Sequence, residues 1–293
     1  MENVEIFFCG LSKNNYGTLK KNIDYISQFR DKSKFSNVNL LIVDSNSEDG
    51  SKELLNKTFD KKDFFNVVHK DDINMIDSRV ERIKICRNLC LQFIEQNSKK
   101  NFVIYIPFDT DFFPLSNTSY DQLDLLISKV ISNRKSNAIF PVSSPFYYDI
   151  FALRAPGWLN INSQLVVSRL KKYLRIGSFL FNYLFIFRYQ LTPEKIKLKK
   201  FTLVSAFGGI GIYNVSNLNL NVQKYDINKK FKEWFSEHLY FNQNFENLEI
   251  ETSWVVDAPI EHVMFKSLKL NKKFMYFLKT FKEDIKSLLR KRL

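Results

Sequence analysis

The chain has 293 residues, of which 45% are hydrophobic and 26% are charged. This balance excludes a disordered or fibrous protein, and a chain of this length can bury a sizeable core. The three cysteines, Cys9, Cys86 and Cys90, form neither a CxxC pair nor a disulfide framework, which favours a reducing, cytoplasmic setting. We expect no signal peptide, and the apolar run at 176–187 is too short to span a bilayer as a helix.

The net charge of +13 is concentrated in residues 159–200 and 266–293, which each carry a net charge of +8 and leave −3 for the rest. Both segments alternate Lys and Arg with Leu, Ile, Phe and Tyr, as basic amphipathic helices on anionic membranes do. This interpretation predicts peripheral binding at the inner face of the membrane. The alternative is a helix packed on the domain with solvated charges. No nucleic-acid-binding module is recognisable, so nucleic acid is not an expected partner.

Short apolar runs alternate with longer amphipathic segments through the first half of the chain. The runs predicted as strands cover residues 4–10, 38–44, 64–70, 102–108 and 137–143. The segments predicted as helices cover residues 18–29, 77–96 and 119–134, with a turn leading into a further helix over 47–59. Strands that alternate with helices predict an α/β fold with a mixed, mostly parallel sheet flanked by helices. In such sheets, ligands bind beyond the carboxyl ends of the strands.

The alternation ends near residue 144, where an irregular aromatic stretch begins. A glycine-rich strand or turn follows at 205–214. No internal repeat or flexible linker is evident. We therefore expect one domain over residues 1–264 with an elaborated C-terminal half. It would contain a basic amphipathic insertion at 159–200 and be followed by a basic C-terminal helix at 265–293.

The most informative stretch is "VIYIPFDTDFF", in which an apolar strand ends in two aspartates separated by one residue. Alternate residues of an extended segment point to the same side, so Asp109 and Asp111 would repel each other unless a cation lies between them. Mg²⁺ or Mn²⁺ would remove this conflict and bridge to phosphate oxygens. The alternative is a surface turn after a strand. Phosphatases of the haloacid-dehalogenase type carry a similar pair, but Phe113 and the four preceding strands depart from their pattern.

Two other stretches place polar groups near the predicted ligand edge. In "IVDSNSEDGS", a strand ends at Asp44 and a polar turn begins at Ser45. The two residues either bond a nucleotide or belong to a capped turn before a helix. On the helix at 77–96, Arg79 and Arg87 lie two turns apart on one face. Two guanidinium groups that point in the same direction could bind a diphosphate. The alternative is that both are solvated arginines on the surface.

Six stretches occur in an order that resembles glycosyltransferases of the GT-A fold: "VDSNSEDGS", "RIKICRN", "IPFDTDFF", "FYYDIFALR", "FGGIGIYN" and "IEHVMF". The likeness is greatest to the cryptococcal, capsule-type alpha-mannosyltransferases and their bacterial relatives, and it covers about residues 4–265. The first and third stretches are widespread in GT-A enzymes, whereas the last three are more specific. The resemblance implies a GT-A, Rossmann-like fold. The basic segment at 159–200 matches no motif of this family.

The resemblance also implies roles for residues at matching positions. Those implied on the sugar-nucleotide side are Asp44, Ser45, Arg79, Arg87, Asn88, Asp109, Gly208 and Gly209. Asp109 and Asp111 would hold the metal, and His262 would complete the metal or diphosphate site. The two glycines would let the backbone approach the donor sugar. Asp149 and Glu261 are the candidates to contact the reacting sugars.

These expectations describe a metal-dependent hexosyltransferase that moves a sugar, such as mannose, from a nucleoside diphosphate sugar to a glycan or lipid-linked glycan. An inverting reaction would need Asp149 or Glu261 as general base, whereas in a retaining one the leaving phosphate would take the proton. The alternatives are a sugar-nucleotide nucleotidyl- or phosphotransferase and an inactive glycan- or membrane-binding homologue. For single residues, the alternatives are an Asp149–Arg154 pair and an ordinary histidine at His262.

Overall fold

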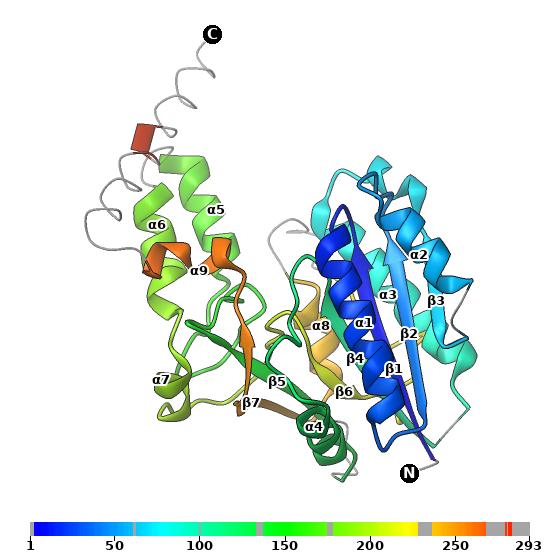
Figure 1. Ribbon diagram of the computed structural model, residues 1–293. Coiled ribbons are helices and arrows are strands. Elements are labelled where there is room, and N and C mark those ends of the chain that lie inside the picture. The colour runs from blue at the N-terminus through cyan, green and yellow to red at the C-terminus, as the bar shows by residue number, and fades with distance from the viewer. Residues whose placement is uncertain are drawn as a thin grey trace.

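The computed structural model describes residues 3–60, 63–99, 101–132, 137–174, 178–227 and 236–267, together with residues 279, 281 and 282. A seven-stranded sheet with the order β3-β2-β1-β4-β6-β5-β7 runs through it (Figure 1). The strands are β1 (Val4–Ser12), β2 (Asn37–Asp44), β3 (Phe65–His69), β4 (Phe102–Asp109), β5 (Asn137–Ser144), β6 (Ile212–Asn214) and β7 (Asn247–Asp257). All neighbours are parallel except where β6 pairs with β4 and β5. The predicted mixed, mostly parallel sheet is therefore confirmed.

Helices pack on both faces of the sheet because successive strand residues point to opposite sides. Three helices cover one face: α1 (Tyr16–Lys32), α2 (Ser51–Phe59) and α4 (Tyr120–Ser132). Phe8 belongs to the apolar core on this side, whereas its neighbour Cys9 belongs to the core on the other side. There Cys9 packs with Cys86 and Cys90 of α3 (Arg79–Asn97), and all three thiols are free and buried, as the sequence predicts.

The centre of the sheet contains the strand that the sequence describes least clearly. The three-residue strand β6 lies within the predicted glycine-rich strand or turn and is antiparallel to both neighbours. The edge strand β7 is absent from the sequence prediction. Its exposed and buried residues alternate irregularly, and its pairing with β5 shifts register between Pro141 and Val142, so no clean apolar run marks it.

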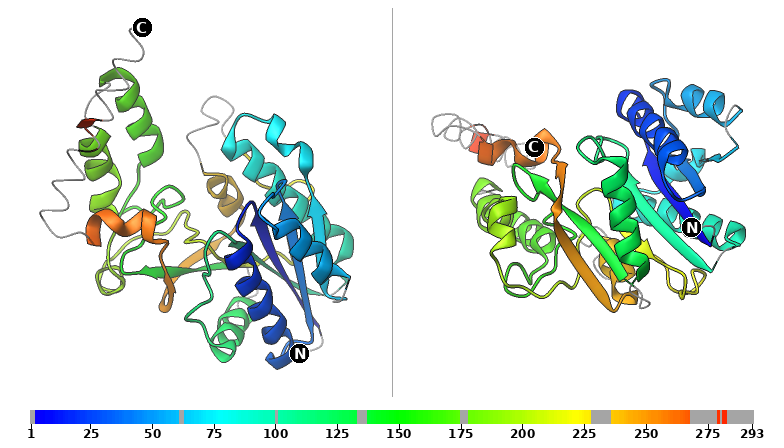
Figure 2. Two further views of the ribbon diagram at one scale, coloured as in Figure 1. Left: turned by 45° about the horizontal axis from the view of Figure 1, so that its top comes forward. Right: turned by 60° about the horizontal axis from the view of Figure 1, so that its bottom comes forward.

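The insertion at 159–200 forms short helices at the far end of the sheet from β3. These are α5 (Ser163–Leu174), α6 (Ser178–Phe185), the 3₁₀ helix η2 (Phe187–Tyr189) and α7 (Pro193–Lys197). Figures 1 and 2 show α5 and α6 beside α9 (Ile260–Ser267), projecting away from the sheet. The fully buried side chain of Ile196 anchors α7 in the core.

The remaining elements are short or lie outside the described part of the chain. They include the 3₁₀ helices η1 (Asp71–Met75) and η4 (Asn242–Asn244) and the helix α8 (His238–Phe241). Most of the predicted C-terminal helix at 265–293 falls outside the described residues. Among the helices that are described, none has both the length and the apolar character needed to cross a membrane.

Candidate active site

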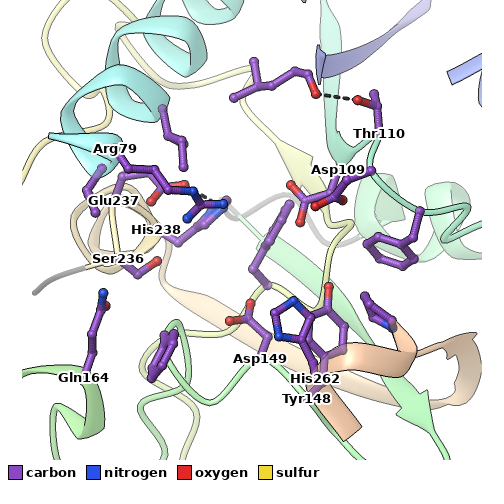
Figure 3. Close-up of a pocket in the computed structure, with 18 of the residues that line it drawn as sticks. Arg79, Asp109, Thr110, Tyr148, Asp149, Gln164, Ser236, Glu237, His238 and His262 are labelled. Atoms are coloured by element: carbon purple, nitrogen blue, oxygen red, sulfur yellow. Dashed lines mark hydrogen bonds and ion pairs between the residues drawn. The ribbon is translucent and has the colours of Figure 1, made fainter. Parts of the chain in front are cut away.

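A cavity of about 650 Å³ opens beyond the carboxyl ends of β1, β4 and β5, which is where parallel sheets bind ligands. Residues of α3, α5, α6 and α9 also line it. Figure 3 shows Arg79, Glu237 and His238 on one side of the cavity, with Asp109 facing them and Asp149 below. The cavity therefore combines residues from both halves of the chain.

The DTD stretch is fixed by its central residue, Thr110, whose side chain is buried. Its hydroxyl donates to the carbonyl of Leu11 at 2.5 Å and accepts a hydrogen bond from the side-chain amide of Asn15. The hydroxyl of Thr18 donates to the Thr110 carbonyl at 2.7 Å. Because Thr110 is bonded to β1 and α1, the aspartates on either side of it both line the cavity.

Asp109 forms an ion pair with Arg87, an arginine of α3 that is 1% exposed. The guanidinium Nη2 donates to Asp109 Oδ1 at 2.9 Å, and its carbon lies 5.1 Å from the ring centre of Phe207. The carboxylate keeps 37% of its side chain exposed, whereas the guanidinium is fully enclosed. Asp109 thus presents its remaining acceptor positions to the cavity while Arg87 supports it from behind.

The site carries more acidic than basic groups around Asp109. Partial burial raises the pKa of Asp109; Arg87 opposes this rise, and the carboxylates of Asp111, Asp149 and Glu237 add to it. Burial likewise raises the pKa of Asp149 and of Glu237. Negative groups that resist ionisation together favour a cation among them.

This donor set fits a hard divalent cation, because carboxylate oxygens are the ligands that Mg²⁺ and Mn²⁺ prefer. Asp109 and Asp111 are the residues that would hold it. Within the described ranges, however, no three His, Cys, Asp or Glu side chains converge closely enough to hold a metal. The predicted third ligand, His262, lies elsewhere in the cavity wall, with its ring stacked on Tyr148 at 5.4 Å between centroids.

The glycine-rich turn approaches the DTD stretch through the backbone. Gly208 and Gly209 have φ values of +74° and +82°, a left-handed conformation that side-chain-bearing residues rarely adopt. The amide of Asp109 donates to the Gly209 carbonyl at 2.8 Å. A Cβ at Gly209 would overlap the ring of Phe112 and the hydroxyl of Tyr148, so any other residue would force both side chains to move.

Asp149 connects this turn to the loop after β5. One carboxylate oxygen accepts from the amide of Gly208 at 3.0 Å and the other from the amide of Ala152 at 3.2 Å. Arg154, the suggested alternative partner, donates instead to the carbonyls of Phe151 and Leu153. The loop thus holds the Asp149 carboxylate in one orientation at the cavity wall.

Two predicted residues serve the fold at positions that do not line the cavity. Asp44 is fully buried, and its carboxylate accepts from the amide and hydroxyl of Ser47 at 3.1 and 2.6 Å. These bonds stabilise the turn after β2, but α2 begins after Gly50 without a side-chain cap. Asn88 exchanges two hydrogen bonds with the backbone of Tyr225, at 3.0 and 2.9 Å, and so joins α3 to that loop. Ser45, Arg79 and Glu261 do line the cavity.

The sequence reasoning missed the buried pair Glu237 and His238. The His238 ring stacks on Phe207 at 3.8 Å between centroids, and its pKa is lowered far below the ordinary value by burial and by Arg87. Glu237 lies beside it, with 3.4 Å between its Oε1 and the imidazole Nε2. The dipeptide Glu-His recurs at 261–262, and that repetition is the one signal that could have drawn attention to this pair.

Comparisons with known proteins find similarity only at the level of solved structures. No family model matches the chain, and no curated protein matches it. It is similar to S. aureus TarS 1–349 at 13% identity, over 89% of this chain and 62% of that one, with a TM-score of 0.45. It is also similar to the mannosyltransferase PcManGT from Pyrobaculum calidifontis, in complex with GDP-Man and Mn²⁺, at 11% identity, over 87% and 57% of the chains, with a TM-score of 0.46.

A third similar structure is glucosyl-3-phosphoglycerate synthase from Mycobacterium tuberculosis, in complex with Mn²⁺, UDP and phosphoglyceric acid. The identity is 12%, over 93% of this chain and 78% of that one, with a TM-score of 0.43. The chain spans about 60% of the lengths of the first two structures. At these scores the likeness carries no argument about chemistry, so the function is argued from the chain's own residues.

Replacing Gly209 with alanine should destabilise the protein by about 1–3 kcal/mol, because the left-handed backbone is strained by any Cβ and two rings would have to move. Thermal unfolding of the purified chain measures this effect. Gly17→Ala on α1 is the matched control, since its Cβ would meet no atom within 4 Å and should leave stability unchanged or slightly raised. Equal melting temperatures for G209A and wild type would contradict the close approach.

Proposed function

We propose that the chain is a metal-dependent glycosyltransferase that moves a sugar from a nucleoside diphosphate sugar to a glycan hydroxyl. The observation that carries this proposal is the presence, in one cavity, of an acidic pair beside a cationic group. Asp109 and Asp111 supply oxygen ligands for a divalent cation, and Arg79 and Arg87 lie on the side where a diphosphate would need positive charge.

In the proposed reaction, the acceptor hydroxyl oxygen bonds to the anomeric carbon of the donor, and the bond from that carbon to the diphosphate breaks. A bound Mg²⁺ or Mn²⁺ would neutralise charge that develops on the leaving diphosphate. Arg87 is buried and held by its ion pair with Asp109, so the charge that it shares with this carboxylate acts on the same group without reorganisation. The Gly208–Gly209 turn supports the acidic pair from the backbone, because the carbonyl of Gly209 accepts from the amide of Asp109.

The proton of the acceptor hydroxyl needs a base if the reaction inverts the anomeric centre. Of the two sequence candidates, Asp149 is favoured because backbone amides orient both of its carboxylate oxygens. Glu261 is exposed in the first turn of α9, and no hydrogen bond to its side chain is found within the described residues. If the reaction retains configuration, the leaving phosphate takes the proton and Asp149 binds a sugar hydroxyl.

The alternative of a nucleotidyl- or phosphotransferase receives less support from the cavity. A phosphate loop would place several backbone amides at the end of β1, but there the side chains of Ser12 and Asn15 bond each other at 2.8 Å. Asn15 also donates to Thr110, so this turn positions the DTD stretch and does not form a phosphate-binding loop.

Nucleotide binding is the first test of the proposal. A thermal-shift screen of GDP-mannose, UDP-, CMP- and dTDP-sugars with Mn²⁺ should identify one donor that raises the melting temperature of wild type; mannose comes first because the sequence resemblance favours it. At a hundredfold excess over the dissociation constant the stabilisation is about 2.7 kcal/mol. Asp111→Asn should abolish the part of this stabilisation that depends on Mn²⁺. Asp31→Asn, which replaces an exposed aspartate on α1, should retain it. If no nucleotide sugar distinguishes these variants, the proposal is wrong.

The role of Asp149 is tested by replacing it with asparagine. For an inverting enzyme, D149N should lower the transfer rate by about 10²–10⁴-fold, the usual contribution of a general base. Nucleotide affinity should change little, because the hydrogen bonds to the Asp149 carboxylate within the described residues come from the amides of Ala152 and Gly208 and do not involve Asp109 or Asp111. Glu261→Gln is the matched control. A rate loss in E261Q that exceeds the loss in D149N would reverse the assignment.

We further propose that the enzyme binds an anionic membrane, where a lipid-linked glycan acceptor would be found. The outer surface of α6 exposes Leu180 and Tyr183, at 51% and 46%, in a segment with a net charge of +8. Exposed apolar side chains among cations suit an interface of acidic lipids.

Sedimentation with phosphatidylserine vesicles measures this binding. The wild type should pellet at low salt and be released by salt, and the double variant Leu180→Asp/Tyr183→Asp should pellet less. Val222→Asp, at a residue 73% exposed and outside this segment, should behave like wild type. Wild-type protein that stays in the supernatant at low salt would rule out the membrane proposal.

A further inference from the structure

The basic insertion at 159–200 matches no family motif, yet it supplies part of the cavity wall. Its contributing residues lie on α5, α6 and η2 or directly flank η2, and they are joined by a neighbour from the loop after β5: Gln164, Asn182, Ile186, Phe187, Gln190 and Phe151. Ile186 follows the end of α6, and its amide donates to the carbonyl of Asn182 at 2.9 Å. Figure 3 shows Gln164 at the end of the cavity away from Asp109.

The insertion is held firmly against the rest of the site. The indole of Trp158 donates to the carbonyl of Tyr189 at 2.9 Å, and the amide of Tyr147 donates to the carbonyl of Leu191 at 2.8 Å. The side chain of Gln190 donates to the carbonyl of His262 at 2.8 Å. These bonds tie η2 and its flanks to the loop after β5 and to α9, so the lining side chains are positioned relative to Asp149.

The charge of the insertion is kept away from the cavity. The segment contains nine Lys and Arg residues, but every lining residue that it contributes from the described part is uncharged. Arg169, Lys171 and Arg188 are exposed at its surface. The described Lys and Arg residues that line the cavity all come from the first half of the chain: Lys13, Arg79, Arg82 and Arg87.

This separation gives the cavity two chemically different halves. The first half offers cations and the acidic pair, which suit a nucleoside diphosphate and its metal. The second half offers amides, aromatic rings, the imidazole of His262 and the carboxylates of Asp149 and Glu261. Amides and carboxylates bond hydroxyl groups, and apolar rings pack against the C–H faces of a sugar, whereas an acceptor phosphate would face negative charge there.

We infer that the insertion forms the acceptor subsite and that it selects a neutral sugar chain over a phosphorylated or otherwise anionic acceptor. This inference rests on the proposed function and specifies the acceptor class of the same site. Gln164 and Asn182 recognise hydroxyl groups, Phe151 and Phe187 contact the sugar faces, and Asp149 receives the reacting hydroxyl.

Ligand-observed NMR on the full chain with Mg²⁺, which is diamagnetic, and the best nucleoside diphosphate tests the inference. The probes are neutral α- and β-linked di- and trisaccharides, paired with the same saccharides bearing a 6-phosphate on the non-reducing sugar. At least one neutral saccharide should bind, and its phosphorylated counterpart should bind at least about tenfold more weakly, a difference equal to one lost polar interaction. Gln164→Ala and Asn182→Ala should each weaken binding of the neutral saccharide by about the same factor of ten.

Two controls separate an effect on the subsite from an effect on folding. Lys197→Ala, at an exposed position of α7 outside the cavity, should bind saccharide as wild type does. Both subsite variants should keep the nucleotide-induced thermal shift of wild type. In a third variant, Gln164→Lys, the introduced cation should improve binding of the phosphorylated saccharide.

The results distinguish this inference from the function on which it rests. If no nucleotide sugar binds, the proposed glycosyltransferase activity fails first. If a nucleotide binds but no neutral saccharide does, or if phosphorylated saccharides bind as well as neutral ones, only the acceptor assignment is overturned. Unchanged saccharide binding in Q164A and N182A would likewise show that the insertion is not the subsite.

Discussion

The site depends on one enclosed positive charge. Arg87 lies under the end of β4, 1% exposed, and contacts a carboxylate in a cavity where three further acids gather. Removing either partner of such a pair typically costs about 3–5 kcal/mol, because the other charge is left without compensation. The guanidinium therefore supports Asp109. Because it is a single positive charge, it also limits how many of the neighbouring acids can be ionised at the same time. A divalent cation would add the charge that a single arginine cannot supply.

Much of the first half of the fold follows from the sequence because its parallel strands are covered on both faces. Such strands appear as continuous apolar runs, and β1, β2, β4 and β5 all match their predicted positions within a few residues. The second half was harder to predict for local reasons. Three residues are too few for β6 to show a pattern, and β7 lies at an edge where exposed Glu and Ser residues interrupt its apolar positions.

The same distinction applies to the site. Asp109 and Asp111 could be selected from sequence because burying a strand does not by itself require two carboxylates at its exit. The ion pair between Asp109 and Arg87 appears only in the folded chain. Asp44 and Asn88 look equally polar in sequence, but they bond buried backbone or side-chain groups, which only a folded chain reveals. Glu237 was missed because tertiary packing, not spacing, brings it close to α3.

The short strand β6 has a structural consequence. It joins β4 through two residue pairs and β5 through two more, whereas β1 shares eight pairs with each of its neighbours. The contact with β4 continues beyond the strand, through the Phe108–Ile210 bridge and the bond from the Asp109 amide to the Gly209 carbonyl. The glycine-rich turn therefore extends the seam that the three residues of β6 begin. That seam, which joins the two parts of the sheet, ends at the backbone of Asp109 itself.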